Sequence, residues 1–179
     1  MNKREQTVFV LVDVQGKLSE IVHESEKMLT NLRKLIQGLQ VLDIPILWLE
    51  QYPDGLGPTN EKIARLLEGT TPIPKMTFSA FKTDTFKEQL QLLNRNQVLI
   101  AGIETHICVY QTAVDLQLNG YDVQVVEDAV SSRTNENKEV GLRKMAALGV
   151  QVTSVEMALY ELMERADDPA FKQLLKIIK

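Results

Sequence analysis

The stretch "QVLIAGIETHICVYQTAVDLQLNGYDVQVVED", residues 97–128, contains the pattern from which the fold class is predicted. It begins with a short apolar run at 97–101, continues as an amphipathic run at 107–118, and ends in a second apolar run at 122–128. Short apolar runs bounded by turn residues are typical of buried strands, whereas the longer run has helical spacing. Asn119-Gly120 is a good C-terminal stop for that helix. The stretch therefore predicts a strand, a crossover helix and a second, parallel strand.

The same alternation of short apolar and longer amphipathic runs extends in both directions along the chain. Two segments rich in proline and glycine interrupt it, residues 51–60 as a loop over the sheet edge and residues 69–81 as an irregular segment, because proline removes a donor and restricts its neighbour. The last helix is expected on the surface or against a partner. Strands are predicted at 7–12, 45–50, 97–101, 122–128 and 150–154, and helices at 25–42, 61–67, 84–93, 107–118, 137–148, 157–164 and 169–179.

These elements predict the fold class. Strand and helix alternate at least five times, and most strands are continuous apolar runs, which indicates burial on both faces. The prediction is a three-layer, doubly wound α/β fold of Rossmann type, with a mostly parallel sheet and helices on both faces. Because no linker, repeat or low-complexity tract divides the chain, residues 1–179 are expected to form a single domain.

Composition excludes several classes of function. The chain has 44% apolar and 25% charged residues and a net charge of -4, so we expect a soluble globular protein that does not bind nucleic acid. No run approaches the ~18 apolar residues that span a bilayer, and we expect neither a signal peptide nor a membrane partner. One cysteine cannot form an internal disulfide, which suits a reducing, cytoplasmic location.

Three reactive side chains stand where such a sheet places its ligands, beyond the carboxyl ends of its strands. Asp13 directly follows the first strand, and Cys108 lies in the first turn of the helix after 97–101, where the helix dipole favours a thiolate. Lys75 would hold the carboxylate and also favour the thiolate. Each has an ordinary alternative: a loop-capping acid, an inert buried cysteine and a solvated lysine.

The two histidines do not complete a recognisable site. His106 is two residues from Cys108, and residues at that spacing do not face each other, so we interpret it as structural or pocket-lining. His23 lies in a loop before the first long helix. Without a cluster of histidine and cysteine, a zinc site has little support, and we expect neither a metal nor a cofactor.

Three stretches together resemble the isochorismatase-like superfamily of cysteine hydrolases. They are "VLVDVQ" (10–15), "KMTFSAF" (75–81) and "GIETHICVYQTAVDLQLNGYDVQVVEDAVSSR" (102–133), and the similar order and spacing extend over about residues 7–165. The chain is most similar to short members with an "EQYPxGLG" loop, here residues 50–57. This loop lacks the histidine of the nicotinamidase metal cluster, and isochorismate hydrolases generally lack the cysteine, which disfavours both of these activities.

The resemblance implies a catalytic triad of Asp13, Lys75 and Cys108. It also implies a cis peptide bond between Ile103 and Glu104 and an oxyanion hole formed by the backbone N–H groups of Glu104 and Cys108. Superfamily members usually form closed homo-oligomers, and the apolar face of the C-terminal helix is a candidate contact surface. Candidate residues of the substrate pocket are Gln15, Gln51, Tyr52, Phe78 and Thr105.

The predicted function is hydrolysis of a small, uncharged amide at its C–N bond, through an acyl-enzyme on Cys108. Asp13 would act as general base and then as general acid. The alternative is a binding or assembly protein that keeps the triad with little or no hydrolysis. A redox-sensing thiol has less support because the chain has no resolving cysteine.

Overall fold

Six strands form one sheet in the order β3-β2-β1-β4-β5-β6, and each neighbouring pair is parallel. The computed structural model describes residues 1–179. The central strands are apolar because they are covered on both sides: all six residues of β1 are buried. The strands are β1 (Thr7–Val12), β2 (Ile46–Gln51), β3 (Ile73–Lys75), β4 (Gln97–Ile103), β5 (Asp122–Ser131) and β6 (Gln151–Thr153).

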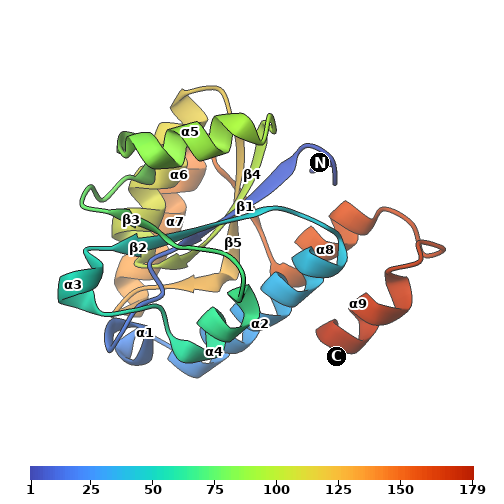
Figure 1. The fold of residues 1–179 in the computed structure, drawn as a ribbon, viewed down its shortest axis with the longest axis horizontal. Coiled ribbons are helices and arrows are strands. Elements are labelled where there is room, and N and C mark those ends of the chain that lie inside the picture. The colour runs from blue at the N-terminus through green and yellow to red at the C-terminus, as the bar shows by residue number, and fades with distance from the viewer.

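Helices cover both faces of the sheet (Figure 1). α2 and α8 lie against one face, and α5, α6 and α7 lie against the other. The predicted three-layer α/β fold is therefore confirmed, with a sheet that is entirely parallel. The helices are α1 (Leu18–Ile21), α2 (Ser25–Val41), α3 (Pro53–Leu56), α4 (Glu61–Ala64), α5 (Asp84–Leu92), α6 (Tyr110–Leu118), α7 (Asn135–Ala147), α8 (Val155–Met163) and α9 (Phe171–Ile178).

The segment predicted to be irregular, residues 69–81, contains the edge strand β3 and the start of a short 3₁₀ helix, Ala80–Lys82. This strand was not predicted, because the prolines of the segment indicated irregular structure. β3 pairs with β2 on one side only, and Pro74 is exposed, so its missing N–H costs little at an edge. The pairing sets Lys75 opposite Gln51, which brings the lysine to the carboxyl edge of the sheet.

The C-terminal helix α9 packs on α2 of the same chain (Figure 1). Leu174 is buried there, Phe171 and Ile178 pack against the core, and Lys34 Nζ donates to the Ile178 carbonyl at 2.7 Å. The apolar face that was expected to contact a partner is thus largely used within the chain. None of the helices combines the length and the apolar character needed to cross a bilayer.

Candidate active site

The candidate site lies where the strand order reverses. β1 is followed by β2 on one side, while β4 pairs with β1 on the other side, so their carboxyl ends frame a crevice. Asp13 follows β1, and Cys108 lies in a π-helical turn, Thr105–Val109, that leads from β4 into α6. The predicted helix start at residue 107 is therefore two residues late. Lys75 reaches the crevice from β3.

Lys75 and Asp13 form a buried ion pair. The lysine side chain is fully buried, and its Nζ lies 2.7 Å from Asp13 Oδ2 and 2.6 Å from Gln51 Oε1. Nζ also approaches the carbonyl oxygens of Thr77 and Phe78 at 3.2 and 3.3 Å. The ammonium group is thus compensated by protein acceptors, as a buried charge requires.

Asp13 keeps one carboxylate oxygen free. Lys75 holds Oδ2, whereas the buried Oδ1 has no hydrogen-bond partner within the chain. Asp13 lines the pocket together with Cys108. Burial raises the pKa of the Asp13 carboxyl above its usual value, and Lys75 opposes that shift. A carboxylate held on one side and unpartnered on the other is arranged as a proton acceptor.

The Cys108 thiol is protonated at rest. Burial raises the pKa of this thiol to about 12, and the negative charge of Asp13 adds to the shift. Lys75 lowers the pKa of Cys108, as expected from the sequence, but burial and Asp13 outweigh it. The expectation of a favoured resting thiolate is therefore corrected. If sulfur attacks a substrate, its proton has to move to a nearby base during the attack.

Two glutamines hold the acidic part of the site in place. Gln15 Nε2 donates to the carbonyl oxygens of Gln51 and Gly57 at 3.0 and 2.8 Å, and Gln15 Oε1 accepts from the Gln51 backbone N–H at 2.6 Å. Gln51 Oε1 accepts from Lys75, and Gln51 Nε2 donates to the Met76 carbonyl at 2.9 Å. Both amides are thus committed to protein partners.

The pocket beside the thiol has a volume of about 130 Å³. Gln15, Gln51 and Phe78 line it, as expected. Tyr52 does not: its side chain is 48% exposed, because the residue turns outward at the start of α3. Thr105 is fully buried behind the pocket surface. The apolar lining residues that sequence reasoning missed are Leu18, Leu56, Ile103 and Ile107.

Glu104 lines the pocket at the turn after β4. The Ile103–Glu104 peptide bond is cis. Glu104 is buried, and its Oε1 accepts from the backbone N–H and the Nε of Arg133 at 3.0 and 3.1 Å. Sequence reasoning used only the backbone of Glu104, although a carboxylate directly after a predicted strand was a signal that this side chain has a partner near the site, here Arg133.

The histidines lie outside the pocket. His106 Nδ1 lies 2.9 Å from Ser132 Oγ, and the His23 backbone N–H donates to the Ser132 carbonyl at 2.8 Å. His106 is therefore structural, one of the two roles expected for it. No group of three or more His, Cys, Asp or Glu side chains is arranged to hold a metal ion.

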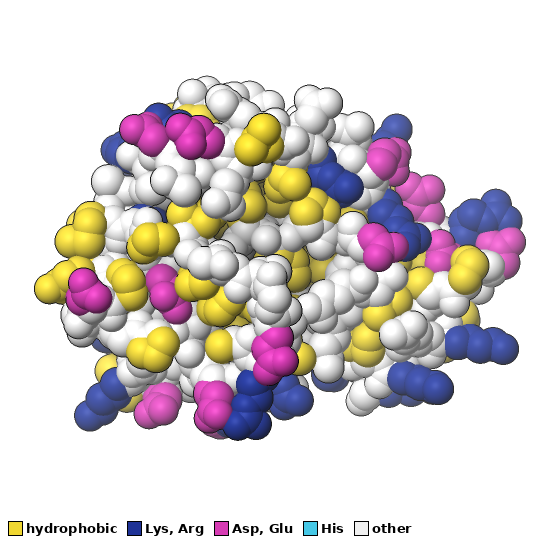
Figure 2. Space-filling view, viewed as in Figure 1, with side chains coloured by type: hydrophobic (Ala, Val, Ile, Leu, Met, Phe, Trp, Pro, Cys, Tyr) yellow, Lys and Arg dark blue, Asp and Glu magenta, His cyan; other side chains and the backbone are white.

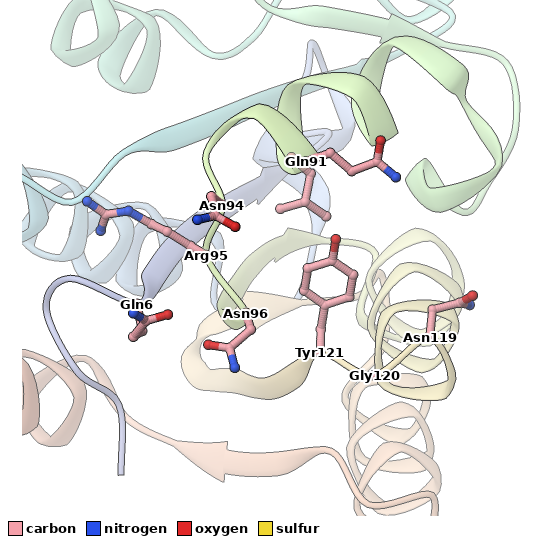
Figure 3. A pocket seen from close by; sticks show the side chains of 9 residues that line it. Gln6, Gln91, Asn94, Arg95, Asn96, Asn119, Gly120 and Tyr121 are labelled. Carbon is pink, nitrogen blue, oxygen red and sulfur yellow. The ribbon is translucent and has the colours of Figure 1, made fainter.

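A larger hollow, of about 480 Å³, lies at the opposite end of the sheet (Figure 3). Its side chains come from α5 and from the turns before β1, β4 and β5, and they are amides, a leucine, an arginine and a tyrosine instead of a nucleophile with an acid. Arg95 is occupied there, since its Nη1 donates to the carbonyls of Arg4 and Thr7. Because Asp13 and Cys108 line the smaller pocket, that pocket is the candidate active site.

Known proteins resemble this chain over almost its whole length. The isochorismatase domain model matches residues 7–157. The secreted isochorismatase effector Isc1 of Phytophthora sojae is 34% identical over 177 residues, which cover 97% of this chain and 84% of the relative.

Solved structures share the fold. A structure described as the MAR1 ribonuclease of Caenorhabditis elegans has a TM-score of 0.92 and 33% identity, covering 99% of this chain and 91% of that one. The ycaC gene product of Escherichia coli, described as an octameric hydrolase of unknown specificity, has a TM-score of 0.92 and 21% identity, covering 98% and 89%. With its parallel sheet and this extent of similarity, the chain belongs to the isochorismatase family and has the fold of that family's hydrolases.

Proposed function

We propose that the protein is a cysteine-dependent hydrolase that cleaves the C–N bond of a small amide through an acyl-enzyme on Cys108. The observation that carries the proposal is the split environment of Asp13, whose Oδ2 is held by Lys75 while Oδ1 stays unpartnered beside the thiol. A buried carboxylate with an unpartnered oxygen is costly to maintain, and its position in one small pocket with a thiol supports a catalytic use.

The first half of the reaction forms the acyl-enzyme. Cys108 Sγ bonds to the amide carbonyl carbon while its proton moves to Asp13 Oδ1. The carbonyl oxygen becomes an oxyanion that accepts from the backbone N–H groups of Glu104 and Cys108, a contribution of about 3–4 kcal/mol in comparable sites. The C–N bond then breaks, and the leaving amine takes the proton from Asp13.

The second half releases the acid. Asp13 takes a proton from water as the water oxygen bonds to the thioester carbon. The C–S bond breaks, the thiolate recovers the proton from Asp13, and the carboxylic acid departs. Lys75 keeps Asp13 oriented through both halves, and the ion pair at 2.7 Å supports that role.

The test compares wild type with Cys108→Ala on a panel of short primary amides, with ammonia release as the readout. We expect wild-type turnover and none above background for the variant. His106→Ala is the matched control, because His106 bonds Ser132 outside the pocket. Equal turnover by wild type and Cys108→Ala would overturn the proposal and favour the binding or assembly role, for which the protonated resting thiol is the supporting observation.

RNA cleavage, suggested by the name of the C. elegans neighbour, is not proposed for this chain. Phosphate recognition needs accessible cations, whereas the chain has a net charge of -4 and two carboxylates, Asp13 and Glu104, line the pocket. Nicotinamidase and isochorismatase activities are likewise not proposed. The reducing, cytoplasmic location expected from the sequence stays a prediction.

We also propose that the chain self-associates, as the octameric E. coli hydrolase does. Hydrophobic side chains gather over α3 and its surroundings in Figure 2. The exposed apolar side chains of this region belong to segments that also supply pocket or triad residues, which favours an assembly surface next to the active site. They are Ile21, Tyr52, Leu56, Met76 and Phe78.

A further inference from the structure

We infer, on the basis of the proposed function, that the pocket selects substrates by charge and that the Glu104 side chain sets this preference. Neutral amides and amides with a positively charged group are admitted, whereas amides that carry a carboxylate are rejected. The substrate class expected from sequence, small uncharged amides, is thereby extended to amides with a positive charge, and amides with an anionic group are excluded.

Some polar side-chain atoms of the pocket are hydrogen-bonded within the protein, and others can still bind a ligand. The side-chain amides of Gln15 and Gln51 bond to protein atoms at both their nitrogen and their oxygen, so they offer little to a ligand. Among the remaining polar side-chain atoms, Asp13 Oδ1 has no hydrogen-bond partner, and the Cys108 thiol has one long contact, from Sγ to Gln51 Oε1 at 4.0 Å. Glu104 accepts from Arg133 through Oε1, so its second carboxylate oxygen retains capacity to accept.

Both compensating cations lie behind the carboxylates and do not line the pocket. Lys75 is fully buried and is surrounded by four protein acceptors. Arg133 binds Glu104 Oε1 from outside, with its side chain 58% exposed and therefore screened by solvent. Asp13 and Glu104 line the pocket whereas Lys75 and Arg133 do not, so the pocket is bordered by the acidic residue of each ion pair.

This arrangement determines what a substrate meets beyond its reacting carbonyl. Asp13 is occupied with the proton of Cys108, which leaves Glu104 as the acceptor for the rest of the molecule. In a cavity of about 130 Å³ with mainly apolar walls, a second carboxylate would be desolvated next to Glu104 without a donor to replace water. An N–H donor on the substrate would instead be stabilised there.

Alkylation of the single cysteine tests this selectivity without any turnover. Neutral iodoacetamide, anionic iodoacetate and cationic 2-bromoethylamine each label Cys108, and intact mass reports the rates. Because the reagents attack the same thiolate, the ratio of their rates is independent of the thiolate fraction. The ratios are divided by those of the urea-unfolded chain, which removes the intrinsic reactivity of each reagent.

We expect the folded protein to discriminate against iodoacetate, relative to iodoacetamide, at least tenfold more than the unfolded chain does. Glu104→Gln should reduce this discrimination at least fivefold, whereas the matched control Glu127→Gln, which removes an exposed acid outside the pocket, should not change it. Arg133→Gln provides a second variant that retains Glu104 and unmasks its charge, so it should increase the discrimination.

The inference would be overturned if the ratio of iodoacetate to iodoacetamide rates were equal in the folded and unfolded chains. It would also be overturned if neither Glu104→Gln nor Arg133→Gln changed this ratio. Hydrolysis is measured separately with butanamide, 3-aminopropanamide and succinamate, with the anionic amide expected to be slowest. If alkylation shows the expected charge selection but none of the amides is hydrolysed, only the proposed function is contradicted. Hydrolysis of succinamate at the rate of butanamide would contradict only the charge selection.

Discussion

Asp13 acts on Cys108 in two opposing ways. Its negative charge raises the pKa of the thiol, which keeps the nucleophile protonated at rest, while its buried Oδ1 has no hydrogen-bond partner and can therefore accept the thiol proton. A base that suppresses the resting thiolate but receives its proton during attack restricts reactivity to bound substrates. Lys75 balances the pair by lowering the pKa of both groups.

Asp13→Asn separates these two effects. Removing the carboxylate charge while Lys75 stays should lower the pKa of Cys108, so iodoacetamide labelling at pH 8 should accelerate at least tenfold. Hydrolysis of a good amide should fall at least a hundredfold, because the asparagine cannot accept the proton. Labelling and turnover are compared on the same preparation. A parallel loss of labelling and turnover would indicate a structural role for Asp13 instead.

The raised pKa of Cys108 also predicts a pH dependence of stability. The folded chain keeps the thiol proton up to a pKa of about 12, whereas the unfolded chain releases it near 9.0, so this group favours folding below pH 9 and the advantage is lost as pH rises from 9 toward 12. Between pH 8 and pH 10, wild type should lose about 1 kcal/mol more free energy of unfolding than Cys108→Ala.

Urea unfolding at both pH values measures this difference. Cys108→Ala is its own control, because the titration of lysine and tyrosine residues is common to both proteins. Identical changes in the two proteins would contradict a raised pKa for the thiol.

At the scale of elements, the contact between β1 and β4 positions the nucleophile relative to its base. Gly102 pairs with Val12 in this ladder and has a φ of +124°. A Cβ at Gly102 would lie 2.1 Å from the Val12 carbonyl oxygen, which is backbone and cannot move aside. Asp13 directly follows Val12, so the same contact fixes the distance between the acid and the turn that carries Cys108.

Gly102→Ala should therefore be strongly destabilising, by about 3 kcal/mol or more in the free energy of unfolding, from steric overlap added to backbone strain. Gly69→Ala is the matched control: Gly69 also has a positive φ, +91°, but open space around its Cβ position, so only about 1–2 kcal/mol is expected. Thermal and urea unfolding measure both. Similar losses for the two variants would show that the approach of β1 to β4 is not tight.

At the scale of the whole molecule, the exposed apolar side chains near the pocket predict assembly. Light scattering with size-exclusion chromatography should give a mass of at least twice the 20.3 kDa of one chain. Met76→Asp, at a side chain that is 69% exposed near the triad, should shift the protein toward smaller species. The matched control is Leu92→Asp, at a position 84% exposed on α5, which should leave the mass unchanged.

A monomeric wild type would refute the predicted assembly. Equal effects of the two variants would show that the assembly surface does not lie on the pocket side of the molecule. The C-terminal helix, the surface first considered from sequence, has its buried Leu174 against α2 and contributes to the core of a single chain.

The layers, the parallel sheet and the strand ends that precede Asp13 and Cys108 follow from the local order of apolar and polar residues. Burial on both faces makes strands continuously apolar, and a parallel strand pair requires a crossover helix, so both properties appear in the local pattern. The pattern failed at β3, since an edge strand of three residues containing Pro74 has no such signature.

Which atoms of the site lack a hydrogen-bond partner depends on contacts that the local sequence pattern does not contain. Hydrogen bonds between residues far apart in the chain commit Gln15 and Gln51 to the protein, and they leave Asp13 Oδ1 without a partner in a residue that lines the pocket. Tyr52 turns outward at the start of α3. The state of Cys108 depends on such contacts as well. Lys75, foreseen from sequence, favours the thiolate, but burial depends on the packing of the whole domain, and it outweighs Lys75.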